Sequence, residues 1–409
     1  MSKEFEVSFT LKGCKYIFMI NNKISNLGLL LILVFCIFSS CSNNNSDATT
    51  SCSPRPAVAS CGTNNQLFGA LPVAASEIQG WVPLGQMSPT PHLLPTDHQY
   101  LYIVHDGVPL VAPGNITVIE ATRSMYSASS VTDFKIKFLA CSEVQGLFVH
   151  VVSIDPSLLS QMGNFDQNCF SYVSGSNTIS TCSTSAKAIS VNQGATIGTA
   201  KNSAGGMTAL DFTLWDSRTA AQVYSNTTRN TISTCDGFDR YHIVPSSDYF
   251  TANLLPTIAG KLGSYDGITQ RTIAPIGGRL NYDVANTAQG YWYSPAVAGT
   301  SPEDSHLSLA PDNINPNLQV ISAGISQPNG YLPNPNIFTP TNSGTTNRNF
   351  SQVSANGQIY CYEFTPFSKV FLIQMLSQTS IKVEYKTGFA SCAAAAPFAF
   401  GLNIFIYER

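Results

Sequence analysis

The chain has 409 residues, and only 11% of them are charged, well below the roughly 25% of an average soluble protein. The formal net charge is −3 and no basic patch with interleaved aromatic residues occurs, so the sequence predicts no nucleic-acid partner. The 29 Gly, 23 Pro and 17 Tyr, with few runs of helix-forming residues, indicate a turn-rich, mainly β fold. This length is typical of two domains, or of one large domain with additions.

The first feature along the chain is an apolar run over residues 27–38, followed by Ser39, Ser40 and Cys41. The run is shorter than the about 20 residues of a membrane-spanning helix and has the length of a signal-peptide core. The Ser-Ser-Cys ending resembles the bacterial lipobox, whose cysteine is acylated and becomes the mature N-terminus. We therefore expect residues 1–40 to be a signal peptide and Cys41 to anchor an exported protein in the membrane of the cell envelope, facing the periplasm or the cell surface. The alternative is an uncleaved N-terminal anchor.

Residues 41–66 are polar, contain prolines and have no apolar period, so we expect a lipidated linker. Export places the mature cysteines in an oxidising compartment, where an even number favours disulfides. The candidates are Cys52, Cys61, Cys141, Cys169, Cys182, Cys235, Cys361 and Cys392. Short spacing suggests the pairs Cys52–Cys61 and Cys169–Cys182, but the many possible pairings leave the connectivity open.

Short alternating runs predict strands in the part of the chain that follows the linker. They cover residues 100–104, 108–112, 116–120, 134–138, 146–152 and 210–215. Two segments predict helices. Residues 155–161 have Asp155 as N-cap and Pro156 at the first position, and residues 247–262 have apolar residues at helical spacing, interrupted by Pro256.

The C-terminal part again alternates short strands with Gly, Pro and Asn turns. Strands are predicted at residues 278–282, 289–293, 358–364, 370–375, 380–385 and 400–407. We expect a domain at 67–225, a helical connector at 226–270, and a β-rich domain at 271–409 that forms a barrel or a sandwich.

Four pieces of the first domain resemble, in order, motifs of the lysostaphin-like (LytM-type) zinc endopeptidases. Residues 107–118 are similar to the Gly-Thr-Pro-Val-Tyr-Ala-Pro hairpin that follows the family's first ligand motif, His-x3-Asp. Residues 148–150 resemble its Tyr-x-His strand, residues 191–198 its Val-x-x-Gly-x-x-Ile-Gly turn, and residues 209–213 its His-Leu-His-Phe-Glu strand. The resemblance implies a two-layer, mostly antiparallel β fold of the hybrid-motif type over residues 67–225, with few short helices.

The resemblance also implies site residues: His98 and Asp211 as metal ligands and His150 as a catalytic residue. In the family, His-x3-Asp and the last His of His-x-His hold zinc, and two further histidines assist the attacking water. Here Tyr102 stands four residues after His98 in place of Asp, and Ala209 replaces one assisting histidine. Zinc catalysis requires three protein ligands, a metal-bound water and a proton-transfer partner. We therefore expect a degenerate, non-catalytic domain without a cofactor.

Such a protein is expected to bind peptidoglycan or other cell-envelope components, or to regulate an envelope protein. The alternative is an active zinc endopeptidase on peptidoglycan peptides, with a ligand set rearranged around His98, His150 and Asp211. Candidates for a further ligand are His92, Asp97 and His105. A second alternative is a surface structural protein, which the weakly charged, Asn/Ser/Thr-rich composition allows.

The C-terminal half has its own cluster of ionisable residues. It contains Glu303, Asp304, His306 and Asp312. The oxygen atoms of these residues could bind a cation, but their spacing matches no known metal-binding loop. A hairpin with an Asp- and Asn-rich turn is therefore the favoured interpretation. The aromatic residues 291–293 could stack on sugar rings, although strand alternation directs part of the run into the core.

Overall fold

The structure is a computed structural model. It describes residues 4–11, 14–21, 55–87, 92–127, 131–174, 177–230, 239–300, 303–324, 336–364 and 368–409. By its internal contacts the chain divides into two units, Met1–Cys52 and Ser53–Arg409. In the first unit, strands β1 (Glu4–Leu11) and β2 (Cys14–Asn21) pair antiparallel. The expected lipidation site Cys41 and the apolar run before it lie outside the described residues. Across the described ranges, no helix has the length and apolar character needed to cross a membrane.

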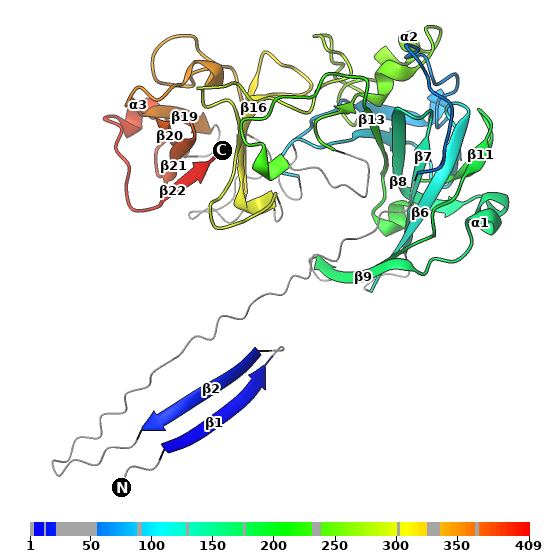
Figure 1. Ribbon diagram of the computed structural model, residues 1–409. Helices are drawn as coiled ribbons and strands as arrows, with labels where there is room; N and C mark the ends of the chain where they lie inside the picture. Colours follow the sequence, from blue (N-terminus) through cyan, green and yellow to red (C-terminus); the bar gives the residue numbers. More distant parts are fainter. Residues whose placement is uncertain are drawn as a thin grey trace. The chain divides into compact units, whose positions relative to one another are not determined.

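The first half of the second unit is built on one large antiparallel sheet (Figure 1). Eight strands follow the order β3-β4-β13-β8-β7-β6-β10-β9, and four short strands pair beside this path. The strands are β3 Ile78–Val82, β4 Gln99–Ile103, β5 Val108–Val111, β6 Ile116–Tyr126, β7 Thr132–Leu139, β8 Val144–Ile154, β9 Gln167–Ser174, β10 Asn177–Ser183, β11 Ile189–Val191, β12 Thr196–Ala200, β13 Ala209–Asp216 and β14 Ile243–Val244. All six strands predicted for this half are present, and the mainly β fold is confirmed.

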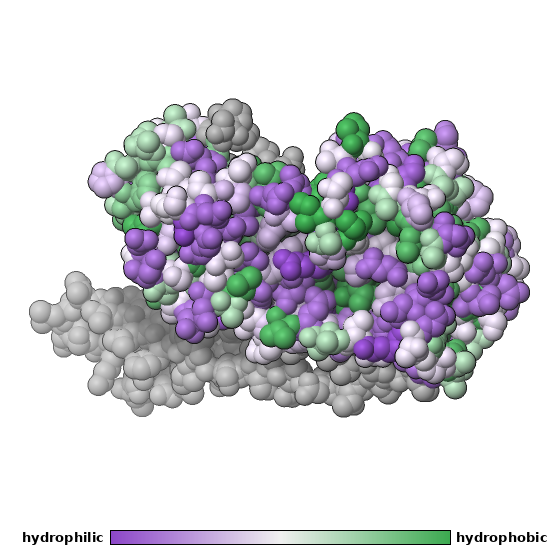
Figure 2. Space-filling view, turned by 90° about the horizontal axis from the view of Figure 1, so that it is seen from above, coloured by the Kyte–Doolittle hydropathy of each residue, from purple (hydrophilic) through white to green (hydrophobic). Residues whose placement is uncertain are grey.

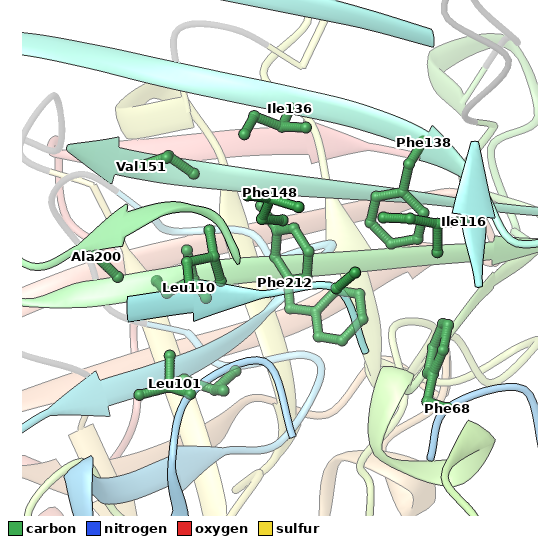
Figure 3. Close-up of a cluster of buried hydrophobic side chains, with 14 of the residues drawn as sticks. Phe68, Leu101, Leu110, Ile116, Ile136, Phe138, Phe148, Val151, Ala200 and Phe212 are labelled. Atoms are coloured by element: carbon green, nitrogen blue, oxygen red, sulfur yellow. The ribbon is translucent and has the colours of Figure 1, made fainter. Parts of the chain in front are cut away.

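One face of this sheet forms the hydrophobic core (Figure 3). Because side chains alternate along a strand, Phe212 of β13, Phe148 of β8 and Leu101 of β4 all point to the same side. All three are buried, and the rings of Phe148 and Phe212 lie 4.6 Å apart. Burying each such side chain stabilises the fold by roughly 1.5–3 kcal/mol. The neighbouring residues along the same strands, including Asp211 and Tyr100, therefore lie on the opposite face.

The helices are few and short. They are η1 Ala75–Glu77, α1 Pro156–Met162, η2 Ser203–Gly205, η3 Thr228–Asn230, η4 Ser246–Tyr249, α2 Leu255–Ala259, η5 Glu303–Ser305, η6 Phe350–Gln352 and α3 Cys392–Ala395. The predicted cap is confirmed, because the Asp155 carboxylate accepts from the amide of Ser157 at 2.9 Å. The single helix predicted over 247–262 is wrong. Pro256 has no amide proton and its ring would clash with a preceding helical turn, so η4 ends first and α2 begins anew at Leu255.

The C-terminal half contains two four-stranded antiparallel sheets. The first consists of β15 Gly290–Trp292, β16 Leu307–Pro311, β17 Gln319–Ala323 and β18 Asn336–Phe338, and the second of β19 Tyr360–Phe364, β20 Lys369–Ser377, β21 Ser380–Thr387 and β22 Ile404–Glu408. Both contribute to one core, in which Trp292, Tyr362 and Tyr407 are buried. Within the described ranges neither sheet closes into a barrel, so of the two expected architectures the sandwich is the better description.

One predicted C-terminal strand is absent. Residues 278–282 make only a single bridge, between Gly278 and Leu84. The backbone of Gly278 has φ of +84°, and a Cβ there would clash with the carbonyl oxygen of Leu84. This close approach of two chain segments requires glycine and is incompatible with a regular strand.

Three disulfides lie within the described residues, and they indicate an oxidising environment. The Cys169–Cys182 pair is confirmed, and Cys361 pairs with Cys392. The predicted Cys52–Cys61 pair is wrong. Cys61 is bonded to Cys141 in the turn between β7 and β8, and the Glu143 carboxylate accepts from the Cys61 amide at 3.0 Å. Cys52 and Cys235 lie outside the described residues.

Several contacts besides the disulfide fasten residues 55–66 to the sheet. The Arg218 guanidinium donates to the carbonyl oxygens of Gly62 and Asn64, each at 2.9 Å, and pairs with Asp216 at 2.7 Å. The end of the predicted linker is therefore fixed to the body. On the face shown, hydrophilic and hydrophobic residues are interspersed (Figure 2), and the strongly exposed hydrophobic residues Val223 and Leu402 lie in separate loops.

Candidate functional site

Three residues that are distant in the sequence meet on the polar face of the large sheet. Asp211 lies on β13, directly opposite Tyr100 of β4 on one side and Val149 of β8 on the other. His98 immediately precedes β4, and His150 follows Val149 on β8. The antiparallel pairing of β4, β13 and β8 therefore places both imidazoles beside the same carboxylate.

The backbone of His150 explains why its side chain reaches this face. His150 has φ of +64°, a left-handed conformation that is uncommon for residues other than glycine. The register between β7 and β8 shifts at this point, since Phe134 pairs with Val151 but Ile136 pairs with Phe148. Such a bulge inserts one extra residue and re-aims a side chain. Here it turns the imidazole toward Asp211.

Both imidazoles point their Nε2 atoms at one oxygen. The distance to Asp211 Oδ2 is 3.6 Å from His98 Nε2 and 3.5 Å from His150 Nε2. Asp211 is only 5% exposed. These distances are longer than a typical hydrogen bond but short enough for strong electrostatic attraction in a buried environment.

Each imidazole is also oriented by a carboxylate of its own. His98 Nδ1 donates to Asp97 Oδ1 and His150 Nδ1 donates to Asp133 Oδ2, both at 2.9 Å. Asp133 is 4% exposed. Asp133 was not predicted from the sequence. The signal that could have identified it is its position as an acidic residue in the amphipathic strand β7. These contacts fix the ring orientations, so Nε2 of each histidine is directed inward.

The charges of the cluster change the protonation of the histidines. Burial lowers the pKa of His98, but the charge of Asp211 and the contact with Asp97 raise it above its ordinary value. Burial likewise opposes protonation of His150, yet the hydrogen bond to Asp133 and the charge of Asp211 raise its pKa to about 9. Burial raises the pKa of Asp211, against the effect of the two imidazoles. At neutral pH the His150 imidazole therefore carries a proton in the metal-free chain.

The side chains of this cluster are of the chemical types that bind metal ions. Metal-binding histidines typically donate their second ring nitrogen to a carboxylate, as both histidines do here. Three buried atoms of the cluster, His98 Nε2, Asp211 Oδ1 and Asp133 Oδ1, have no hydrogen-bond partner. Buried polar atoms without partners are rare and indicate a missing cation, donor or water.

The distances between the two histidines suit a shared metal ion less well. Among the described residues, three metal-ligand atoms lie within 4.8 Å of one another only for Cys61, Cys141 and Glu143, whose sulfurs form a disulfide. The two imidazoles of the site are thus each close to Asp211 but too far from each other to share one zinc ion at about 2.1 Å. Zinc coordination by all three residues would require the rings to move together.

No family model and no curated protein matches this chain. The likeness to lysostaphin-like peptidases therefore depends on the four sequence pieces alone. Two departures from the family pattern lie side by side, because Tyr102 of β4 pairs directly with Ala209 of β13.

The three candidates for a further ligand, His92, Asp97 and His105, do not all lie at the site. The His92 ring lies 5.8 Å from the His98 ring, and burial together with His98 lowers the pKa of His92 to about 4, so this imidazole is neutral. His105 is outside the cluster: its side chain is 73% exposed and pairs with Glu77 at 2.8 Å. Only Asp97 contacts the site through a hydrogen bond.

The second candidate cluster has structural roles. His306 is fully buried and accepts from the Ser294 amide at 3.1 Å. Asp312 accepts from the amides of Ile314 and Asn315 in the turn between β16 and β17, as the favoured hairpin interpretation predicts. Residues 291–293 are all buried, so stacking of sugar rings on them is excluded.

The C-terminal half nevertheless contributes to the site by holding the loop that bears His98. The Glu303 carboxylate accepts from the Leu94 amide at 3.0 Å, and the Ser322 hydroxyl donates to the Leu93 carbonyl at 2.8 Å. Leu93 and Leu94 are buried against the aromatic cluster around Tyr291. The position of His98 therefore depends on residues far along the chain.

Proposed function

We propose that this chain is an exported, lipid-anchored protein of the bacterial cell envelope whose large sheet carries a degenerate lysostaphin-like site. In this proposal the site binds peptidoglycan peptides or glycans, or presents them to a partner, and does not cut them. The composition and the disulfides support export. The geometry of the cluster around Asp211 supports the proposed site.

The observation that carries the proposal is the cluster around Asp211. Two carboxylate-oriented imidazoles flank a buried carboxylate on one face of the large sheet. Directly beside them, Tyr102 and Ala209 remove a carboxylate ligand and a proton-transfer group. Loss of a proton-transfer group typically lowers a rate by about 10²–10⁴-fold. His98, His150 and Asp211 are retained, whereas one carboxylate ligand and one proton-transfer group are replaced.

Sedimentation with purified peptidoglycan tests this proposal. The full chain in detergent should sediment with the wall, and His150→Asn should weaken that binding while tolerating the left-handed backbone. His105→Asn is the matched control, since its imidazole also pairs with a carboxylate but is exposed and lies outside the cluster. Binding that is absent, or that both variants affect equally, would contradict the proposal.

The second candidate function is an active zinc endopeptidase. It is favoured by the unpartnered His98 Nε2 and by the carboxylates that orient both histidines. A bound zinc ion would supply an activated water and polarise the scissile carbonyl. Metal analysis of the purified chain distinguishes the two candidates: one equivalent of zinc that is lost in His98→Ala supports the enzyme, and a metal-free wild type supports the binding protein.

A further inference from the structure

The β9–β10 hairpin presents two exposed aromatic rings. β9 is the last strand along the path of the large sheet (Figure 1). Phe170 is 61% exposed and Tyr172 is 46% exposed, and because they are two residues apart on β9, both lie on the same face. Their ring centroids are 5.9 Å apart and the ring planes are inclined by 27°. The two side chains therefore form one aromatic surface, with nearly parallel rings, in contact with solvent.

This aromatic surface shares a face of the sheet with the candidate site. Residues that pair directly across neighbouring strands lie on the same face. Phe170 of β9 pairs with Thr181 of β10, which pairs with Ser124 of β6. Ser124 in turn pairs with Asp133 of β7, the carboxylate that orients His150. Three strand spacings, roughly 14 Å, therefore separate Phe170 from Asp133 along this row.

Tyr126 of β6 connects the hairpin to the site. It belongs to the neighbouring row, in which Tyr172 pairs with Ile179 and Ile179 pairs with Tyr126. The Tyr126 hydroxyl donates to Asp133 Oδ2 at 3.4 Å, the oxygen that also accepts from His150. A half-buried aromatic ring thus lies between the exposed pair and the candidate site.

The backbone beside the aromatic pair is cross-linked. Cys169, directly before Phe170, is bonded to Cys182 of β10. The register of the hairpin shifts at this point. The disulfide limits the freedom of this irregular segment, so less conformational entropy is lost when a ligand binds to the exposed rings.

The chemistry of the hairpin favours a carbohydrate ligand. Neither strand contains a charged residue, so the hairpin offers no electrostatic attraction to an anionic lipid surface or to a charged peptide. The C–H groups of a pyranose ring pack against an aromatic face, whose negative quadrupole attracts them. The hydroxyls of Tyr126 and Tyr172 are of the type that donates to and accepts from sugar hydroxyls. The stacking surface that the buried residues 291–293 do not provide is thus present on this hairpin.

We propose that Phe170 and Tyr172 stack on the pyranose rings of a cell-wall glycan strand, and that Tyr126 extends this surface toward the candidate site. This inference rests on the proposed wall-binding function and names the glycan as the part of the wall that contacts this end of the sheet. A single sugar on the exposed rings would not reach Asp133, whereas a longer strand would contact both places.

Binding of glycan strands freed of their peptides tests the assignment. The strands are obtained from peptidoglycan by amidase digestion, and isothermal calorimetry measures their binding to the full chain in detergent. The strands should bind, and the released stem peptides should not displace them.

Two variants locate the surface. Phe170→Ala and Tyr172→Ala should each weaken glycan binding by about 3- to 10-fold, because each removes one stacking ring. Tyr172→Phe keeps the ring and should retain most of the binding. Tyr265→Ala is the control, since Tyr265 is 58% exposed but lies in a turn packed against β3, at the other end of the sheet. Near-ultraviolet circular dichroism checks folding, and analytical ultracentrifugation checks the oligomeric state.

The outcomes separate the two proposals. Failure of the free strands to bind, or equal binding by the wild type and both alanine variants, overturns the glycan assignment; wall binding that still depends on His150 leaves the wall-binding proposal standing. Wall binding that is weakened in Phe170→Ala and Tyr172→Ala but unchanged in His150→Asn supports the stacking surface and contradicts the role proposed for the Asp211 site. Alanine variants that change only self-association overturn the glycan assignment and indicate that the open edge of β9 pairs with a second copy.

Discussion

The imidazole of His150 lies 3.5 Å from the carboxylate of Asp211 because one residue of β8 departs from strand geometry. A regular strand would direct adjacent side chains to opposite faces. The left-handed backbone at His150 instead lets it share a face with Val149, which pairs with Asp211. Strained backbone of this kind is frequent at functional sites, where surrounding structure compensates for its cost of about 1–3 kcal/mol.

This backbone predicts an order of stability among variants of His150. Asn tolerates the left-handed conformation, whereas β-branched Val does not. His150→Val should therefore lower the free energy of unfolding by about 1–2 kcal/mol more than His150→Asn. Urea unfolding measures both values, and equal stability of the two variants would contradict the assigned backbone.

His150 should also link stability to pH. Its pKa of about 9 in the folded chain lies above the ordinary value of 6.5, so folding favours the protonated imidazole. The stabilisation is complete below pH 6.5 and is lost as the pH rises through about 9. The side chain is 35% exposed, which reduces the effect to about 1–2 kcal/mol over this range. Urea unfolding in the presence of a chelator should give this decline in the wild type and much less in His150→Asn; an identical decline in both would be inconsistent with it.

The three disulfides should contribute unequally. They join residues separated by 80, 31 and 13 positions for Cys61–Cys141, Cys361–Cys392 and Cys169–Cys182. Closing a longer loop restricts the unfolded chain more, with expected contributions of about 4–5, 3–4 and 3 kcal/mol. Paired Cys→Ala variants should lose stability in that order. A larger loss from the Cys169–Cys182 pair than from the Cys61–Cys141 pair would contradict the loop-closure explanation.

Lipid anchoring at Cys41 is tested in cells. The expressed protein should incorporate labelled palmitate and partition into the detergent phase. Cys41→Ala should abolish both properties, because the other cysteines are not acylation sites in this proposal. Labelling that persists in the variant would exclude Cys41 as the anchor.

Much of the large sheet could be predicted because its strands alternate clearly between apolar and polar residues. Phe148 and Phe212 mark the core face, and on β13 the neighbours of Phe212, Asp211 and Thr213, mark the opposite face. The β9–β10 hairpin was not predicted, since its strands are rich in Ser, Thr and Asn and resemble loops in composition. The strand at residues 278–282 was predicted wrongly because a backbone contact with Leu84 decides that segment.

The candidate site was predictable only in part. His98, His150 and Asp211 were identified from sequence motifs, and their proximity depends on strand order and register. Asp133 was missed, and Glu303 was assigned to a separate cluster, because their contacts with the site are tertiary and have no local spacing signal. The positive φ of His150 was equally inaccessible, since a bulge results from two strands with unequal residue counts.

The central claim is that this site binds wall material without cutting it, and one measurement tests it most directly. Purified peptidoglycan is incubated with the full chain, with added zinc or with a chelator, and the release of soluble fragments is measured alongside sedimentation. We predict binding to the wall and no zinc-dependent release. Fragment release that disappears with chelator and returns with zinc would contradict this account and establish the enzyme instead.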